Sequence, residues 1–383
     1  MREHSDVVIV GGGPVGAALA LALADSGVGV QVLEARADLD RPAHKRTLAL
    51  SYGSRLILER LGVWAALRTV TEIKDIHISH AGGLGMARLH AEEEDLPALG
   101  YVVDYAELDS SLHAALRRTD VAVVTGALVK DAASYAGYAR VKAEIAGVPR
   151  HITTRLAVVA DGGAGSSTPR QTKDYAQHAL LASVSAEIGP QGWAYERFTA
   201  QGPVALLPQG DGYALVWTAT PERVRELLIL PEPVFLVELH AHFGDRVGHF
   251  SSVSSRTSFP VNLSYVRDTI APHRVIIGNA AHILHPVAGQ GFNLGLRDAW
   301  ELAGSIRASR HEELGNLRML KDFQGGRRLD TAGSIFFTDL LVSLFSNDIP
   351  VLRHGRSLGL LALQQLRPLK RFVARRMIFG APG

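Results

Sequence analysis

Three short apolar runs, each followed within two residues by glycine, stand out along the chain. They are Val7–Val10, Leu156–Ala160 and Arg274–Ile277, and apart from Arg274 each is continuously apolar. A strand buried on both faces of a parallel sheet has this pattern, whereas a half-exposed strand alternates. Because glycine lets bare backbone approach a ligand closely, the pattern predicts a parallel sheet that binds a ligand at its strand ends.

The first run opens a nucleotide-binding pattern. Gly11 to Gly16 fits G-x-G-x-x-G, a helical segment rich in alanine and leucine follows to Ser26, and a second apolar strand leads to Glu34. In this pattern Gly11 permits the tight turn, Gly13 lets the backbone meet a pyrophosphate, and Gly16 lets helix and strand pack closely. The acid accepts hydrogen bonds from an unphosphorylated ribose, which favours FAD or NAD over NADP. A glycine-rich turn that binds nothing is the alternative, and the order and spacing of the parts disfavour it.

A different pattern occupies residues 75–98 and 177–267. Apolar and polar positions alternate there in short segments such as the end of Ala179–Ala186, where Ala182, Val184 and Ala186 are separated by serines. Helical patterns lie near Glu222–Leu228 and Val234–Phe243. Alternation is typical of strands with one buried face. We therefore predict a strand-rich insertion with helices over one face of its sheet.

Two helical patterns lie near the C-terminal end. The first has an apolar stripe at helical spacing, made by Phe336, Leu340, Leu341, Leu344 and Phe345. The second is basic and amphipathic, with Leu366, Leu369, Val373 and Met377 among Arg367, Lys370, Arg371, Arg375 and Arg376. Such a helix lies on an anionic membrane surface or docks on the protein with its basic face in solvent, and both interpretations stay open.

Composition narrows the class of protein. With 383 residues the chain is long for one core, which favours two domains or one domain with a large insertion. A formal net charge of +2 gives no basic field for nucleic acid. The sequence has no cysteine, which excludes disulfides, thiolate metal sites and Fe–S clusters. We expect no signal peptide and no membrane-spanning run of about 20 apolar residues, so the expected location is cytoplasmic.

The third glycine-rich strand end carries the densest motif. It reads Gly-Asn-Ala-Ala-His from Gly278, and His-Pro-Val-Ala-Gly-Gln-Gly-Phe-Asn-Leu-Gly-Leu-Arg-Asp from His285 to Asp298. Together with the turn at Gly11 and the Asp-Gly strand end at Asp161, it resembles the flavoprotein aromatic hydroxylases related to p-hydroxybenzoate hydroxylase. The motif, and the segment Arg-Thr-Leu-Ala-Leu-Ser that begins at Arg46, are similar to the branch that acts in ubiquinone biosynthesis.

The resemblance implies a fold and two domains. The fold is an α/β, Rossmann-like FAD-binding domain with an inserted α+β substrate domain. The FAD-binding domain would comprise residues 1–74, 99–176 and 268–383, with the C-terminal helices. The substrate-binding domain would comprise residues 75–98 and 177–267, and the aromatic ring would lie between its sheet and the flavin.

The resemblance also implies the site residues. Glycines of the first turn would hold the FAD pyrophosphate, Glu34 the ribose, Asn279 the ribityl chain or pyrophosphate, and Gly289 to Asn293 the isoalloxazine. The expected cofactor-binding residues are Gly11, Gly13, Pro14, Gly16, Glu34, Arg36, Arg46, Asp161, Asn279, Gly289, Gly291, Phe292 and Asn293. Two positions depart from the broad family, which has Asp where this chain has Asn279 and often a basic or amide residue where it has Tyr105.

Three residues of the motif are candidates for the reaction itself. Pro286 fixes the backbone beside the ring, and Gln290 opens a helix whose free N–H groups would face the anionic reduced flavin. His285 either assists deprotonation of a phenol or has a purely structural role. His282 and His285 lie three residues apart, but carboxylates nearby are few, so no metal is expected.

The implied activity is hydroxylation of the aromatic ring of a polyprenylated phenol, with bound FAD. NAD(P)H would act as a transient reductant, since no second dinucleotide fingerprint is present, and O2 would react through a flavin C4a-hydroperoxide.

The membrane-resident substrate also implies a peripheral position at the inner membrane surface and contact with other ubiquinone-biosynthesis proteins. The alternatives are a hydroxylase of a soluble phenol and a non-catalytic flavoprotein scaffold of a biosynthetic complex. A flavin-dependent halogenase is disfavoured because W-x-W-x-I-P is missing.

Overall fold

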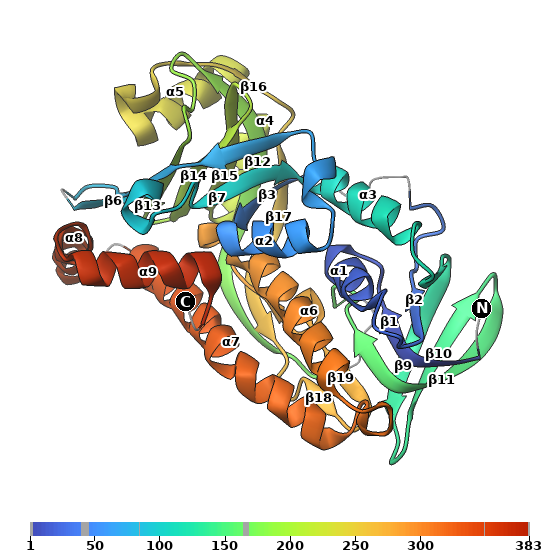
Figure 1. The fold of residues 1–383 in the computed structure, drawn as a ribbon. Coiled ribbons are helices and arrows are strands. Elements are labelled where there is room, and N and C mark those ends of the chain that lie inside the picture. Colours follow the sequence, from blue (N-terminus) through green and yellow to red (C-terminus); the bar gives the residue numbers. More distant parts are fainter. Residues whose placement is uncertain (1–2, 40–45, 84, 164–167, 348, 382–383) are drawn as a thin grey trace.

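The computed structural model describes residues 3–39, 46–83, 85–163, 168–347 and 349–381. Within these residues the strands form an eight-stranded, a nine-stranded and a three-stranded sheet. Figure 1 shows the eight-stranded sheet with the N-terminus at lower right and the nine-stranded sheet at the top. The predicted fold class, a Rossmann-like α/β region with an inserted α+β region, is confirmed by this architecture.

The eight-stranded sheet contains all three glycine-terminated runs. Its path is β18-β19-β11-β1-β2-β8, in which β19, β11, β1, β2 and β8 are parallel neighbours. The bounds are β1 (His4–Val10), β2 (Val30–Leu33), β8 (Ala122–Val124), β9 (Ala127–Ser134), β10 (Ala139–Ile145), β11 (Val148–Val159), β18 (Ile270–Ala271) and β19 (Arg274–Ile276). The carboxyl ends of parallel strands share one edge, so the three glycine turns meet there.

Strand β1 is buried on both faces. Val7 and Ile9 belong to a core shared with the helices, whereas Val8 and Val10 belong to a core shared with the antiparallel strands β9 and β10. The helices that pack together on this sheet are α1 (Pro14–Leu23), α3 (Tyr105–Leu116) and α6 (Gln290–Ala308). This double burial explains why the segment Val7–Val10 of the strand is continuously apolar.

The nine-stranded sheet forms the inserted region. Its path is β20-β17-β12-β15-β14-β13-β5-β6, and β16 pairs with β12. The bounds are β5 (Asp75–His80), β6 (Met86–His90), β12 (Gln171–Ala186), β13 (Trp193–Thr199), β14 (Gly202–Gln209), β15 (Gly212–Ala219), β16 (Phe250–Val253), β17 (Thr257–Tyr265) and β20 (His282–Ile283). Helices α4 (Pro221–Ile229) and α5 (Glu232–Phe243) pack on one face, as the periodicity predicts.

A small sheet joins the two large ones. It has the order β3-β7-β4, from β3 (Thr47–Ser51), β7 (Gly100–Asp104) and β4 (Val70–Ile73), and helix α2 (Tyr52–Arg60) follows β3 directly. The described residues also contain short 3-10 helices: η1 (Trp64–Ala66), η2 (Ala91–Glu94), η3 (Gly244–Val247), η4 (Gly278–Ala280), η5 (Val287–Gly289) and η6 (His311–Glu313).

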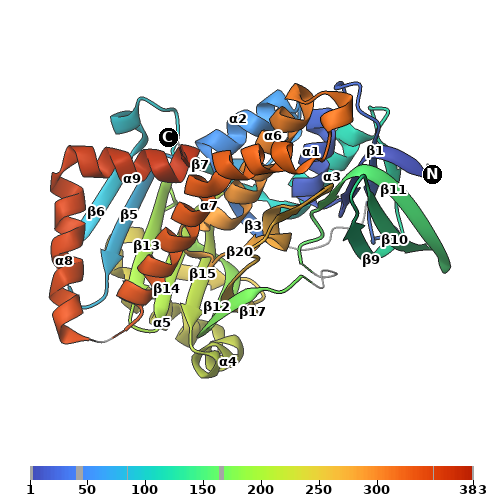
Figure 2. The same ribbon diagram turned by 90° about the horizontal axis from the view of Figure 1, so that it is seen from below.

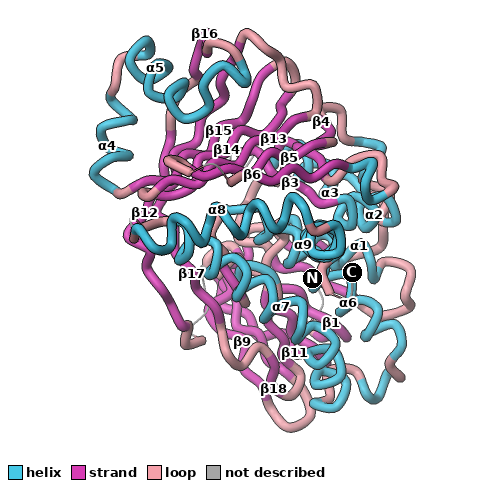
Figure 3. The backbone as a smooth tube through the Cα atoms, turned by 90° about the vertical axis from the view of Figure 1, so that its left-hand side faces the viewer, coloured by secondary structure: helices cyan, strands magenta, loops and turns pink. Residues whose placement is uncertain are grey.

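In the described part of the chain, three α-helices follow α6: α7 (Leu317–Phe345), α8 (Pro350–Gln365) and α9 (Arg367–Phe379). Figure 2 shows α7 running from α6 to the far edge of the nine-stranded sheet, where α8 lies beside β6. Figure 3 places this sheet between α4 and α5 on one side and α7 to α9 on the other. Among the described residues, no helix is long and apolar enough to cross a membrane.

The predicted helices are confirmed with shifted ends. The first begins at Pro14, not Ala17, because proline is compatible with the first turn of a helix, where its missing N–H needs no partner. The two C-terminal patterns lie in α7 and α9. Helix α8, which the sequence analysis does not predict, lies between them, and Pro350 and Pro368 each lie in the first turn of a helix.

Candidate functional site

A cavity of about 920 Å³ lies where the three sheets meet and extends to the C-terminal helices. It is lined by most of the residues that the sequence predicts for the cofactor and the reaction. These are Gly11, Gly13, Pro14, Glu34, Arg36, Arg46, Asp161, Asn279, His285, Pro286, Gly289, Gly291 and Phe292. Gly16, Gln290 and Asn293 do not line it.

The glycines of the first turn occupy different environments. A Cβ at Gly11 would lie 2.5 Å from the carbonyl oxygen of Ala160, and the φ of Gly11 is +101°, so this position requires glycine. A Cβ at Gly16 would lie 2.0 Å from the carbonyl oxygen of Gly11, so Gly16 sets the contact of helix and strand. At Gly13 nothing lies within 4 Å, and its backbone borders the open cavity.

The first turn of α1 has the chemistry of an anion-binding site. Gly13 is the N-cap, no side chain caps the helix, and no acid lies in the first turn. The free N–H groups and the positive end of the helix dipole therefore point into the cavity. This is the arrangement that binds the pyrophosphate of a dinucleotide.

Glu34 lies at the end of β2 with its carboxylate across the glycine turn. The backbone N–H of Gly12 donates to Oε2 at 2.6 Å, and the backbone N–H and Nε of Arg36 donate to Oε1 at 2.9 and 3.0 Å. A carboxylate has about four lone-pair positions, so the three donors leave room for a ribose hydroxyl.

Arg36 and Arg46 line the same end of the cavity. Arg36 donates from Nη1 to Asp109 of α3 at 2.6 Å. Burial opposes its charge, but the carboxylates of Asp109 and Glu34 outweigh burial and raise the pKa of Arg36. Arg46 stacks on Tyr105 with 4.5 Å from Cζ to the ring centroid, so the tyrosine that departs from the family pattern positions this arginine.

Two further predicted residues meet at the edge of the sheet. Asp161 follows β11 and accepts a 2.9 Å hydrogen bond at Oδ1 from the N–H of Gly163. Asn279 lies in η4, where its carbonyl oxygen accepts from Nη2 of Arg170 at 3.2 Å. Both residues line the cavity, and Asp161 lies beside the first glycine turn, because a Cβ at Gly11 would lie 2.8 Å from its Cα.

The loop from His285 to Phe292 forms the middle of the cavity wall. Ala288 and Gly289 have φ values of +58° and +61°, and the chain then enters α6 with no side-chain cap and no acid in the first turn. A Cβ at Gly291 would meet nothing within 4 Å. Two uncapped helix ends and open glycine backbone on one cavity fit an extended, anionic dinucleotide such as FAD.

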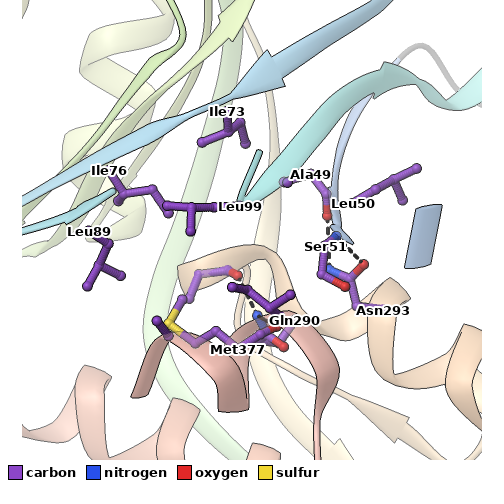
Figure 4. Close-up of a pocket in the computed structure, with 14 residues that line it drawn as sticks. Ala49, Leu50, Ser51, Ile73, Ile76, Leu89, Leu99, Gln290, Asn293 and Met377 are labelled. Atoms are coloured by element: carbon purple, nitrogen blue, oxygen red, sulfur yellow. Dashed lines mark hydrogen bonds between the residues drawn. The ribbon is translucent and has the colours of Figure 1, made fainter. Parts of the chain in front are cut away.

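Asn293 holds the loop in place (Figure 4). Its Oδ1 accepts from the N–H of Ser51 at 2.9 Å and from Oγ of Ser54 at 2.7 Å, and its Nδ2 donates to the carbonyl oxygens of Ala49 and Gly289 at 3.0 and 2.8 Å. The amide is 2% exposed. Because its hydrogen-bonding capacity is used within the protein, we expect Asn293 to position the loop rather than to touch the cofactor.

Gln290 also points away from the main cavity. Its Nε2 donates to the carbonyl oxygens of Ala288 and, in α9, of Met377, at 3.1 and 3.4 Å. Together with Asn293 it borders a separate cavity of about 70 Å³. Its geometry favours a role in joining the loop to the C-terminal helix over one in the reaction.

His285 is fully buried and neutral. The N–H of Val287 donates to Nδ1 at 3.0 Å, so the proton is on Nε2, which donates to Oε1 of Gln177 at 3.2 Å. Burial lowers the pKa of His285 to about 3. Of the two roles that the sequence leaves open, this geometry favours the structural one, because both ring nitrogens are engaged.

A buried ionic network lies behind the loop. Asp298 accepts from Nε2 of His282 at 2.8 Å and from Nε of Arg327 at 2.9 Å, and Asp330 pairs with Arg327 and Arg297, each at 2.7 Å. Burial alone would raise the pKa of Asp298, but His282 and Arg327 outweigh it and lower that pKa to about 2. His282 is therefore the partner of a carboxylate.

The half of the cavity beside the nine-stranded sheet has mostly apolar walls and one acid that the sequence analysis does not single out, Glu196. Its neighbours on the same face of β13 are Ala194 and Phe198. The sequence does contain a signal for this residue, because Glu196 is an acid at a position that belongs to the apolar face of an alternating strand.

Comparison with known proteins gives the family. Residues 4–320 match the family model described as FAD binding domain. A ubiquinone hydroxylase of Rhodospirillum rubrum is 34% identical, with 97% of this chain and 89% of that protein covered. The 3-demethoxyubiquinol 3-hydroxylase of Escherichia coli is 33% identical, with 97% of each chain covered.

Solved structures agree on the fold. The p-nitrophenol 4-monooxygenase of Pseudomonas putida superposes with a TM-score of 0.78 over 100% of both chains, at 17% identity. At that identity the likeness supports the fold alone. Family model and relatives together lead to one conclusion: the chain belongs to the FAD-binding flavoprotein monooxygenases, in the group that contains the ubiquinone hydroxylases.

Proposed function

We propose that this protein hydroxylates the aromatic ring of a polyprenylated phenol in ubiquinone biosynthesis. The observation that carries the proposal is the continuity of one cavity, from the glycine turn at Gly11 to an apolar chamber beside the C-terminal helices. FAD, when bound, supplies the transfer of one oxygen atom from O2, with NAD(P)H as the transient reductant.

The apolar chamber suits a prenylated substrate. Its walls include residues of three helices, Phe337, Leu341 and Phe345 of α7, Leu360 and Leu363 of α8, and Val373 and Met377 of α9. These side chains have no hydrogen-bonding group that a polar ligand could use, whereas an isoprenoid chain gains about 25 cal/mol for each Å² that it buries. A soluble phenol would leave most of this surface unused.

We propose distinct roles for the residues of the nucleotide end. The uncapped first turn of α1 at Gly13 holds the pyrophosphate, and Glu34 receives the ribose. The backbone from Gly289 to Phe292 lies against the isoalloxazine, and Pro286 keeps the approach to the ring rigid. Support comes from the open backbone and the free N–H groups at these positions.

We assign the substrate-binding domain to residues 75–98 and 177–267, and the FAD-binding domain to the remainder. The nine-stranded sheet draws its strands from 75–90 and 171–265, plus the short β20, which supports this division. The apolar face of the sheet and the loop at Pro286 border the same cavity, so the ring of the substrate would lie between the two domains.

We also propose peripheral association with an anionic membrane surface. Helices α7, α8 and α9, with Leu366 between the last two, expose large apolar side chains: Phe336, Leu340, Leu358, Leu361, Leu366, Leu369 and Phe372. Arg367 and Arg371 are exposed on α9 among them. Apolar and basic side chains together are typical of helices that lie in a lipid interface. Flotation with anionic vesicles should decrease in Leu369→Glu/Phe372→Glu, and binding equal to the unchanged protein would contradict the proposal.

Genetic complementation tests the function most directly. The gene is expressed in bacterial strains that each lack one ubiquinone hydroxylation step, and the quinones are identified by mass spectrometry. Restoration of ubiquinone in one strain is the expected result, and it also identifies the ring position. If every strain continues to accumulate its precursor, while the purified FAD-loaded protein turns over small soluble phenols, the substrate class is wrong.

A further inference from the structure

Glu196 faces the cavity from the middle of β13. Its cross-strand partners are Ala205 in β14 and Ile78 in β5, and both line the same cavity. Side chains that pair across neighbouring strands project from the same face of a sheet, so the carboxyl of Glu196 projects into the cavity.

The carboxyl has no charge to balance it. Within the described part of the chain, Oε1 of Glu196 is buried and has no hydrogen-bond partner. Burial raises the pKa of this carboxyl from 4.5 to about 8, and no neighbouring charge contributes. A buried polar atom left unpaired destabilises the fold, which indicates that a ligand group completes the site.

Other ionisable side chains of the cavity are engaged or distant. Glu34, Arg36, Arg46, Tyr105 and Asp161 line the nucleotide end, near the first glycine turn or the end of β11. On the sheet side, Tyr195 turns to the opposite face of β13, where it packs on Tyr213 and Phe243, and His77, Arg88 and Arg246 lie toward that face as well. His285 uses both ring nitrogens within the protein.

Glu196 also lies near the loop from His285 to Phe292, against which we place the flavin. Phe198, two residues along β13, belongs to one buried cluster with Val287, which follows Pro286 directly. Two residues of a strand span about 7 Å, close to the length of a phenol ring with its oxygen. A ring held between Pro286 and β13 would therefore direct a hydroxyl group toward Glu196.

On this geometry we propose that Glu196 binds the phenolic hydroxyl of the substrate and accepts its proton. The inference rests on the proposed function, because it takes a phenol as the substrate. The O–H bond of the phenol breaks, its electron pair stays on the phenolate oxygen, and the proton forms a new O–H bond on the carboxylate. No oxidation or reduction occurs in this step, and the proton leaves to water with the product. The phenolate ring is more electron-rich and so accepts oxygen more readily.

The test compares Glu196→Gln with the unchanged holoenzyme in binding and in turnover. Binding of 2-farnesylphenol and of its methyl ether is measured by the change in flavin absorbance without reductant. We expect the unchanged protein to prefer the phenol by about tenfold to a hundredfold, as for a hydrogen bond to a charged group, and Glu196→Gln to lose that preference.

In turnover, kcat/KM of the unchanged protein should rise with pH toward a plateau above about 8. In Glu196→Gln, kcat/KM should be about 10²–10⁴-fold lower and should no longer rise with pH.

Matched variants distinguish the proposed role of Glu196 from a general loss of structure. Glu72→Gln removes an exposed carboxylate of β4 and should leave both measurements unchanged, whereas Glu196→Asp keeps the carboxyl and should retain the pH-dependent rise. FAD content and the rate of flavin reduction by NAD(P)H should be equal in all variants. If Glu196→Gln keeps the preference for the phenol and the pH profile of the unchanged protein, and still hydroxylates the prenylated phenol, this inference alone is wrong. Failure of the unchanged protein to bind either compound would overturn the proposed function and this inference with it.

Discussion

Replacing Asp298 with asparagine should destabilise the fold and weaken FAD binding together. The carboxylate of Asp298 accepts from His282, from Arg327 and, at 3.3 Å, from the N–H of Gly278. Asparagine has nearly the same shape but carries no charge, and its amino group must face one of these donors. The loop that begins at Gly278 lines the cavity through Asn279, so a displaced loop affects the cofactor site.

The magnitude follows from the pKa and from the burial of the pair. The pKa of Asp298 falls from 3.8 to about 2, which corresponds to roughly 2 kcal/mol of stability at neutral pH. Breaking a buried ion pair costs about 3–5 kcal/mol. In the variant, Arg327 keeps its ion pair with Asp330 at 2.7 Å, which reduces the loss from the broken ion pair with Asp298. We expect a total loss of about 2–4 kcal/mol, with weaker retention of FAD.

The pH dependence has a defined sign. A carboxyl whose pKa is lower in the folded state stabilises the protein above its unfolded pKa of 3.8, and this stability is lost as the pH falls through about 2. The difference between Asp298→Asn and the unchanged protein should therefore be constant from pH 5 to 7. Near pH 3 about half of the charge-dependent part should remain.

Urea unfolding of the FAD-free proteins at several pH values measures the loss, and fluorescence titration measures FAD affinity. Asp322→Asn is the control, since this aspartate is exposed on α7, the helix that also carries Arg327 and Asp330. The reasoning is refuted if both variants unfold within about 0.5 kcal/mol of the unchanged protein, the scale of a neutral surface substitution.

Three further substitutions give separate expectations. Gly11→Ala should prevent folding or leave the protein insoluble, because its Cβ would lie 2.5 Å from the carbonyl oxygen of Ala160 at a φ of +101°; a soluble, FAD-loaded variant would contradict this. Gly291→Asp should fold, since nothing lies within 4 Å of its Cβ, yet lose FAD because bulk and charge enter the cavity; a yellow variant with full FAD content would count against our placement of the loop. Burial raises the pKa of Glu196 to about 8, so the neutral carboxyl stabilises the fold at low pH and this stability is lost as the pH rises through 8. FAD-free Glu196→Gln should therefore match the unchanged protein at pH 4 and exceed it by about 2–5 kcal/mol at pH 9 in urea unfolding, and equal stability at both pH values would argue against an unpartnered carboxyl.

Local chemistry explains what could be predicted from the sequence. The strand, turn and helix around Gly11, and the acid at Glu34, lie between Val7 and Glu34, so their spacing alone defines a dinucleotide site. The positions of helices and strands followed from periodicity in the same way. Their ends shifted by a few residues where proline determined the start of a helix, as at Pro14.

The roles of polar side chains depended on partners far away in the chain. Asn293 lies in a motif that resembles a flavin-binding segment, yet its oxygen binds Ser51, which is 242 residues distant. His285 has the residue type of a general base, yet Gln177 engages it from β12, 108 residues away. No local pattern indicates such partners, because they meet only in the folded chain.

The sequence by itself determined the fold class, the family and the nucleotide end of the site, since these depend on glycines and apolar periods in short segments. The tertiary structure alone decided which ionisable groups remain available in the cavity. It buries His285 with both nitrogens bonded and leaves Oε1 of Glu196 without a partner among the described residues. The physical reason is that burial and hydrogen-bond partners set the chemistry of a side chain, and both are properties of the packed chain.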